Sequence, residues 1–357
     1  MNKTFIIGAL LALATCSYGQ TEVKQYVPGI TTEGVTYYLP KTALHITVKA
    51  DRTTVYPGEF KDYAQRYLKL SSVAQAEETT WTIREIKLTP YGVPDSTKVF
   101  TIPLRKKTVA PLVGLTQSGI ITSINIEGQD ETTPEISREN VIHKSTLNPR
   151  DFMTEEILQA GNKMKMAELI AAEIYDIRES RSLLSKGQAD YMPKDGEQLK
   201  LMMQQLDTQE EALLQLFKGT TETETKTYSL DFLPEGEMSQ EILFRFSKEL
   251  GLVDKNNLAG SPVYVDVVDK KTVPAAVVDP KQKKINEESV RYNIPSQVSL
   301  KLFDRTKTYA EITTPMGQFG RIEYLSSELF NKRPTTRVTF YSTTGGLKKL
   351  SDTNIME

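Results

Sequence analysis

The chain has 357 residues, with 44 basic and 46 acidic side chains, and its formal net charge of −2 is close to neutral. A near-neutral chain without long runs of one charge has no electrostatic footprint for nucleic acid or for an anionic membrane surface. The length is sufficient for two domains of roughly 150 residues each. We therefore expect no nucleic-acid partner.

The N-terminus predicts export. An apolar run over residues 5–14 is followed by small residues at Ser17 and Gly19, which is the pattern of a signal peptide cleaved before Gln20. A second interpretation stays open, because Cys16 follows a weak version of the lipobox that precedes a lipidated cysteine. The apolar run is shorter than the roughly 20 residues that a membrane-spanning helix needs, and no later segment comes close. We expect no transmembrane segment in the mature chain.

The next part of the chain predicts strands. Between residues 34 and 126, apolar and polar residues mostly alternate, as in half-buried strands. One helix is expected over 59–70, where apolar residues recur at helical spacing. Residues 112–115 and 120–126 flank a polar turn with a glycine and predict a β-hairpin. The polar, proline-containing stretch 127–150 predicts a loop.

Two long helices are expected next. Thr154 caps the first, with acidic residues in the opening turn and no proline before Pro193. Asp195 caps the second, which ends at Gly219. The short connection predicts an antiparallel αα-hairpin. Some apolar residues lie off the main apolar stripes and would need a second surface to cover them. These residues are Met166, Leu183, Leu184 and Leu216.

The period of two returns at residue 225. Strands are expected over 243–246, 263–268 and 273–278, and the polar stretch 280–289 predicts a loop. Asp95-Ser96-Thr97 in the N-terminal part lies in a stretch that also predicts a loop, with a Pro-Asp-Ser turn as its simplest interpretation.

The C-terminal part then echoes the N-terminal part. Tyr292-Asn293-Ile294-Pro295 matches Tyr37-Tyr38-Leu39-Pro40, and Gly317 and Phe319 precede a short helix-like stretch through Leu329. Duplication and chance similarity of strand patterns both remain open. We expect an α+β fold of two strand-rich, duplicated lobes with an inserted long helical hairpin. The predicted divisions are a signal peptide (1–19), an N-terminal lobe (20–148), the hairpin (149–219) and a C-terminal lobe (220–357).

The chain offers few residues for catalysis. Its histidines, His45 and His143, lack metal-site spacing, and its one cysteine lies in the predicted signal peptide. No nucleophile elbow or phosphate-binding loop occurs. We therefore assign no catalytic, cofactor or metal residue and lean against an enzyme, although a pair of carboxylates in a cleft stays open. The adjacent acids are expected to be solvated, and Trp81 to be in the core. Those acids are Glu77-Glu78, Glu155-Glu156, Glu210-Glu211 and Glu287-Glu288.

Several segments together resemble the domain-of-unknown-function 4831 family of Bacteroidota. They are Tyr38-Leu39-Pro40-Lys41-Thr42, Thr89-Pro90-Tyr91-Gly92-Val93-Pro94-Asp95, Pro111-Leu112-Val113-Gly114-Leu115, Phe244-Arg245-Phe246-Ser247 and Gln318-Phe319-Gly320. The resemblance implies a Gram-negative envelope protein, in the periplasm or associated with the outer membrane, and brings no catalytic residues with it. It also implies an O-glycosylation pattern at Asp95-Ser96-Thr97, with Ser96 as the acceptor.

Two functions from different classes remain in competition. The first is a non-enzymatic envelope scaffold or interaction protein that binds another envelope protein through the helical hairpin. The alternative is an envelope protein that binds or degrades carbohydrate, with a glycan as its partner. A cleft with exposed aromatic residues or an isolated carboxylate pair would favour the alternative.

The cleavage site gives a testable prediction. We expect the exported protein to begin at Gln20, because Ser17 and Gly19 suit signal peptidase better than Thr15 suits a lipobox. Intact mass spectrometry of the exported protein measures this. A diacylglyceryl mass on a chain beginning at Cys16 would contradict it and make the protein membrane-tethered.

Overall fold

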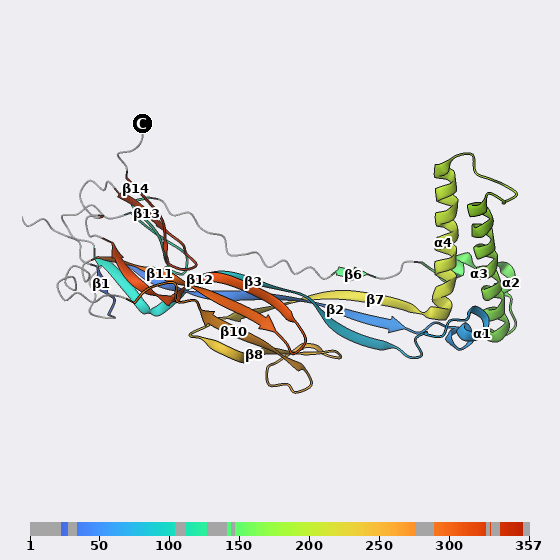
Figure 1. The fold of residues 1–357 in the computed structure, drawn as a ribbon, viewed down its shortest axis with the longest axis horizontal. Coiled ribbons are helices and arrows are strands. Elements are labelled where there is room, and N and C mark those ends of the chain that lie inside the picture. The colour runs from blue at the N-terminus through green and yellow to red at the C-terminus, as the bar shows by residue number, and fades with distance from the viewer. Residues whose placement is uncertain are drawn as a thin grey trace, which may run out of the picture.

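The molecule is elongated, with a strand-rich body at one end and a helical head at the other (Figure 1). A computed structural model describes residues 23–27, 34–103, 112–126, 141–143, 147–275, 289–325, 329 and 336–352. Long strands run from the body to the head. The expected strand-rich α+β class is confirmed.

The described strands and helices follow one another along the chain, with most strands in the body. The strands are β1 (Lys24–Gln25), β2 (Gly34–Tyr56), β3 (Glu78–Pro103), β4 (Val113–Leu115), β5 (Ile121–Ile124), β6 (Val141–His143), β7 (Thr220–Phe232), β8 (Met238–Ser247), β9 (Gly251–Val253), β10 (Ser261–Asp269), β11 (Val290–Phe303), β12 (Thr308–Leu325), β13 (Thr336–Phe340) and β14 (Leu347–Asp352). The helices are η1 (Lys61–Tyr63), α1 (Ala64–Leu68), η2 (Pro149–Phe152), α2 (Glu155–Leu158), α3 (Lys163–Lys186) and α4 (Gly196–Lys218).

Two of the sheets pack against each other in the body. One has the strand order β1-β3-β2-β7-β6 and the other β12-β11-β10-β8-β9. Alternate residues of β2, Leu44, Ile46 and Val48, are buried in the core they share with β10 and β11. Burying each such side chain contributes about 1.5–3 kcal/mol. This alternation fixes which face of β2 meets the second sheet.

A second core lies at the outer end of the body. Here the start of β2 contributes Tyr37 and Leu39, which pack with Ile121 and Ile124 of β5 and Val338 of β13. The sheet behind this core has the order β14-β13-β5-β4. Burial raises the pKa of Tyr37 well above its usual range, since its ring is enclosed in this core. The strand β2 thus contributes side chains to both cores.

A buried polar cluster joins the sheets between the two cores. Asn293 is completely buried, and its side-chain Nδ2 donates to the carbonyl oxygens of Pro40 at 3.0 Å and Thr344 at 2.8 Å. The side-chain amide of Gln318 accepts from the N–H of Thr42 and donates to its carbonyl oxygen, each at 2.8 Å. These bonds satisfy the backbone of β2 where β7 has not yet begun to pair with it.

Beyond the body, β2, β3 and β7 continue towards the head as a narrow ribbon, the neck (Figure 1). Its cross-strand contacts are polar. The hydroxyl of Thr225 donates to Asp51 at 2.7 Å, and Arg52 and Glu224 form an ion pair at 3.7 Å. Such pairs stabilise neighbouring strands modestly, by about 0.2–1 kcal/mol each. The neck is therefore held mainly by its backbone ladder.

Several sequence-based expectations are wrong in detail. The helix-like stretch expected after Phe319 is strand through Leu325, because β12 pairs with β11 as far as Val290. The helix expected over 59–70 is reduced to η1 and α1, and Lys69 ends it in the left-handed conformation. The first long helix breaks after α2, and Asn162 caps α3 afresh.

Some of the predicted loops and strands also differ from those in the structure. Residues 273–275 are in no strand, and residues 276–278 lie outside the described part. The short strand β6 lies within the expected 127–150 loop and pairs with β7. The β-hairpin expected over 112–126 is confirmed as β4 and β5, which pair antiparallel.

The pairing also crosses the predicted division into lobes. Although β7 follows the predicted boundary at residue 220, it pairs with β2 along 13 residue pairs. Likewise, β13 from the C-terminal part pairs with β5 from the N-terminal part. The N- and C-terminal strand-rich parts therefore share sheets.

The buried polar cluster supports a stability prediction. We expect Asn293→Ala to destabilise the protein by about 2 kcal/mol, because two carbonyl oxygens at a buried site lose their donor. Asn256, exposed in a turn, is the matched control, and Asn256→Ala should change stability by less than about 0.5 kcal/mol. Urea unfolding measures both. Equal midpoints for the two variants would contradict the role given to Asn293.

Candidate functional site

The helical head is built from two separate parts of the chain. One is the connection between β2 and β3, which contains η1 and α1, and the other runs from η2 through α4. They share one apolar core, in which the tilted rings of Phe60 and Phe217 pack with centroids 5.8 Å apart. Ile170 and Ile174 of α3 fill its centre, both completely buried. The head therefore has a core of its own, separate from the two cores of the body.

An ion-pair cluster connects α3 to α4. Glu210 on α4 is only 7% exposed. Its carboxylate accepts from Arg178 Nε at 2.6 Å and from Arg181 Nη1 at 2.8 Å. Arg181 also binds Asp207 at 2.7 Å, and this bond, with the charge of Glu210, raises the pKa of Arg181. The expectation that Glu210 is solvated is wrong, because α3 covers it with two guanidinium groups.

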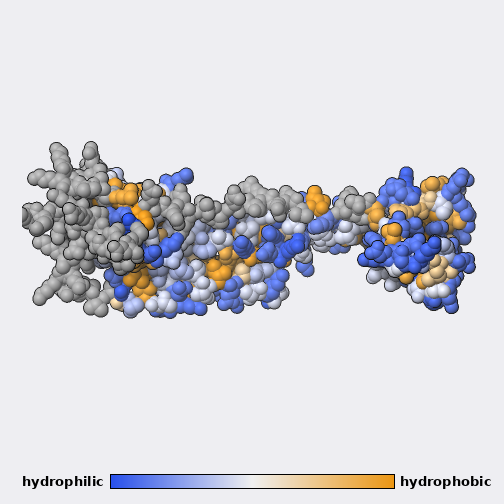
Figure 2. Space-filling view, turned by 90° about the horizontal axis from the view of Figure 1, so that it is seen from above, coloured by the Kyte–Doolittle hydropathy of each residue, from blue (hydrophilic) through white to orange (hydrophobic). Residues whose placement is uncertain are grey.

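An apolar groove, the tip groove, lies at the far end of the helical pair. It encloses about 550 Å³ between the end of α3, the start of α4 and the loop that joins them. Leu201 is 65% exposed beside it, and Tyr191 is 60% exposed. Hydrophobic surface is visible on the head among hydrophilic surroundings (Figure 2). The groove is lined by Ser180, Leu183, Leu184, Ala189, Asp190, Tyr191, Leu201, Met202, Gln205 and Leu206.

The four residues expected to lie off the main stripes have different surroundings. Met166 and Leu216 pack against the head core. Leu184 is buried in the wall of the tip groove, and Leu183 beside it is 36% exposed. Only the pair nearest the tip therefore contributes to the groove.

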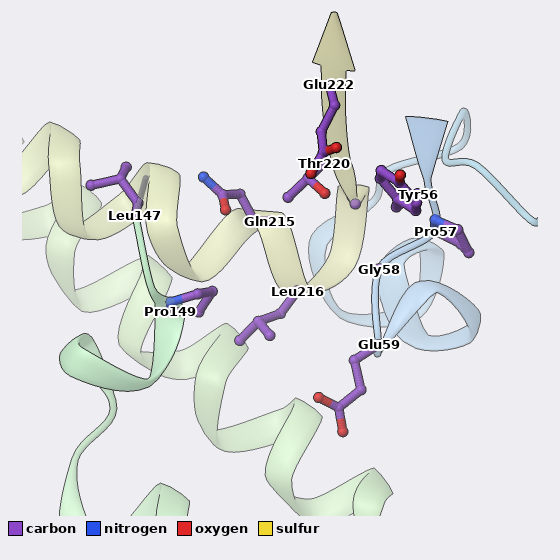
Figure 3. Close-up of a pocket in the computed structure, with 11 residues that line it drawn as sticks. Tyr56, Pro57, Gly58, Glu59, Leu147, Pro149, Gln215, Leu216, Thr220 and Glu222 are labelled. Carbon is purple, nitrogen blue, oxygen red and sulfur yellow. The ribbon is translucent and has the colours of Figure 1, made fainter. Parts of the chain in front are cut away.

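A second hollow, the junction cavity, lies where the head meets the neck (Figure 3). It encloses about 540 Å³ between the ends of β2 and α4 and the start of β7. The chain crosses itself closely here, since a Cβ on Gly219 would lie 1.9 Å from the carbonyl oxygen of Tyr56. Gly219 also has a φ of +88°, which favours glycine. The cavity walls are consequently fixed by backbone.

The histidines lie apart from both hollows. Nδ1 of His45 on β2 is 2.9 Å from a carboxylate oxygen of Asp231 on β7. Tyr91 is also near Asp231, and burial followed by this carboxylate raises the pKa of Tyr91. His143 is exposed on β6. Trp81 is buried, as expected, and packs near Tyr228. The two histidines are not brought together.

Ser96 lies in a bulge of β3, where a loop was expected. The pairing steps from Tyr38 opposite Val99 to Pro40 opposite Pro94, so residues 95–98 bulge outwards. The buried Asp95 accepts from the N–H and hydroxyl of Thr97, at 3.0 and 2.7 Å. Ser96 itself is exposed.

The predicted export residues Cys16, Gly19 and Gln20 lie outside the described residues. Within the described part of the chain, no group of three or more histidine, aspartate or glutamate side chains is arranged to hold a metal. Across the same residues, none of the helices combines the length and apolarity required to span a membrane.

Comparison with known proteins identifies the family of this chain. The family described as "Domain of unknown function (DUF4831)" matches residues 33–348, which include the body, the neck and the head. No curated protein and no solved structure matches the chain.

The ion-pair cluster yields a prediction for the head. Glu210→Ala should destabilise it by about 2 kcal/mol, since the loss leaves two arginines without their shared carboxylate. Glu211→Ala, at the neighbouring exposed position, should have little effect. Hydrogen exchange of α3 and α4 reports on the head separately from the body. Unchanged protection in Glu210→Ala would show that the cluster does not stabilise the helical pair.

Proposed function

We propose that this protein, which belongs to the DUF4831 family, is a non-enzymatic cell-envelope scaffold that binds another envelope protein through its helical head. The tip groove is the observation that carries the proposal. In the head, α3 and α4 stand across the long axis of the molecule, and the tip groove lies at the end of this pair away from the neck, where a partner can approach without contacting the strand-rich part (Figure 1). Export to the envelope is supported by the N-terminal signal pattern.

The chemistry of the tip favours a protein partner. Leu201 and Tyr191 expose most of their surface in a groove that is also lined by other leucines and a methionine. Apolar side chains and aromatic anchors in a pocket are typical of the energetic centre of protein interfaces. Burying Leu201 on binding would remove apolar surface from water at about 25 cal/mol per Å². A docked apolar side chain would thus be stabilised here.

The head suits this task because its own charges stabilise its shape. Glu210, Arg178 and Arg181 bind one another across the helical pair. A pre-organised surface binds with a smaller loss of conformational freedom than a flexible one. The neck then presents this rigid surface at a distance from the body.

We also propose that the two strand-rich parts arose by duplication, with the head inserted between them. Two matching bulges support this: the pairing shifts between Tyr38 and Pro40 in β2 and between Ile294 and Ser296 in β11. Pro40 is the first residue paired after the bulge in β2, and Pro295 is the unpaired residue within the bulge in β11. In addition, β2 forms a long antiparallel pair with β3, and β11 forms one with β12.

O-glycosylation at Ser96 remains part of the proposal. The bulge keeps Ser96 exposed, and Asp95 holds the segment in a fixed turn. An exposed hydroxyl on a fixed turn is accessible to a modifying enzyme.

A substitution in the tip groove tests the proposed function. Leu201→Asp should reduce partner recovery at least tenfold, because a charge placed in an apolar contact must be desolvated on binding. Met164→Asp is the matched control, since Met164 is an exposed apolar residue on α3 outside the groove. Affinity purification from the native envelope with quantitative mass spectrometry measures recovery.

Comparing partner recovery with Leu201→Asp and with Met164→Asp distinguishes binding at the tip groove from binding elsewhere. Loss of one defined envelope protein with Leu201→Asp alone, with unchanged circular dichroism, supports binding at the tip. Equal recovery from Leu201→Asp and the unmodified protein would contradict it.

A further inference from the structure

The helical pair of the head is covered by other helices at its base but not at its tip groove. Near the neck, α3 and α4 pack with side chains of α1 and α2, among them Leu68 and Ile157. The members of this head core on α3 end at Ile177, and those on α4 begin at Leu206. The tip groove is lined by α3, α4 and the loop between them. It therefore lacks the third helical layer that the base of the same pair has.

The walls of the tip groove are two short stripes at helical spacing. Leu184 lies four residues after Ser180 on α3, and Leu206 lies four residues after Met202 on α4. Residues four positions apart lie on one face of a helix, so each stripe runs along its helix axis. Five residues at a rise of 1.5 Å extend roughly 7 Å. A partner helix of about two turns is long enough to contact both walls.

A helix suits this groove better than an extended segment. The backbone groups of a helix bond within the helix, so only its side chains need to match the groove. An extended segment points its side chains to alternate sides, and its backbone needs an unpaired strand edge, which α3 and α4 do not offer. Docking an amphipathic helix by apolar residues three and four positions apart is a general mode of recognition.

Asp190 restricts the charge of such a helix. It is the one charged residue among the described lining residues, it is exposed, and it forms no ion pair within the described part of the chain. The charges next to the lining in the sequence are mixed. They are Glu179, Lys186, Lys194, Asp195, Glu197 and Lys200. An acidic side chain placed at Asp190 would meet a like charge, whereas a lysine or arginine would form an ion pair.

We propose that the tip groove binds an amphipathic helix of the partner protein, which carries apolar side chains one turn apart and a lysine or arginine that pairs with Asp190. Leu183 on α3 and Leu201 on α4 contact the apolar side chains. The helix thereby supplies at the tip the layer that α1 and α2 supply at the base. This inference rests on the proposed function, because it specifies the segment of the partner that the head recognises.

Site-specific cross-linking in the native envelope tests the kind of segment. The photo-reactive amino acid p-benzoylphenylalanine replaces Tyr191, which is 60% exposed in the groove. The control places it at Tyr175, which is 45% exposed on α3 outside the groove. We expect a cross-link from position 191 and none from position 175. Mass spectrometry should locate it in a segment with apolar residues three or four positions apart and a lysine or arginine within one turn.

A charge exchange tests the pairing with Asp190. Asp190→Lys should weaken binding of a synthetic peptide of the cross-linked segment about fivefold, because an attraction becomes a repulsion. Replacing the basic residue of the peptide by glutamate should restore binding to Asp190→Lys. Asp176→Lys, at an exposed position of α3 outside the groove, is the matched control and should bind normally. Fluorescence anisotropy measures affinity, and circular dichroism confirms that each variant is folded and that the bound peptide is helical.

The outcomes separate this inference from the proposed function. A cross-link to an extended or acidic segment of an envelope protein would overturn the inference and leave the proposed function in place, as would equal affinity of the peptide for folded Asp190→Lys and the unmodified protein. A cross-link to lipid alone, to a second copy of this chain, or to nothing would contradict both.

Discussion

The continuity of β2 is the constraint on which the rest of the structure depends. Its 23 residues, at about 3.3 Å each, extend roughly 75 Å as one strand. Its first part lies in the outer core with Tyr37, its middle part lies in the sandwich core with Ile46, and its last part forms the neck. A one-residue slip in pairing would turn all these side chains to the wrong face. The bulge between Tyr38 and Pro40, the buried amide of Asn293 and the half-buried amide of Gln318 fix the register against such a slip.

The head forms where three strands, β2, β3 and β7, extend beyond the body and connect to helices. The turn between β11 and β12 is short, whereas the connection between β2 and β3 enters the head and supplies Phe60 to its core. The return path runs from α4 through Gly219 into β7. Both paths cross at the junction cavity, so the head is attached by the three strands of the neck and by a close backbone crossing. This double attachment favours a fixed orientation of the tip groove relative to the body.

Local chemistry made part of this fold predictable. Asp195 accepts from the N–H of Gln198 at 2.7 Å and α4 ends at Gly219, as the capping pattern indicates. The failures have a common cause in tertiary contacts. Pairing with β11 keeps residues 321–325 in a strand despite a helix-like pattern. Glu210 looked solvated because its arginine partners lie some 30 residues away on another helix. The tip groove and the junction cavity form where segments distant in the sequence pack together, and the spacing of residues along the sequence does not predict such packing.

The most direct test of this account is the distance between head and body. The mature chain predicted here contains no cysteine, so Asp176→Cys on α3 and Glu311→Cys on β12, both exposed, give two unique spin-label positions. Pulsed electron paramagnetic resonance measures the distance distribution between them. A rigid neck predicts a single narrow distribution that does not change with salt, because the backbone ladder and not the exposed ion pairs holds it. A broad or salt-dependent distribution would contradict a head held in fixed orientation by β2, β3 and β7.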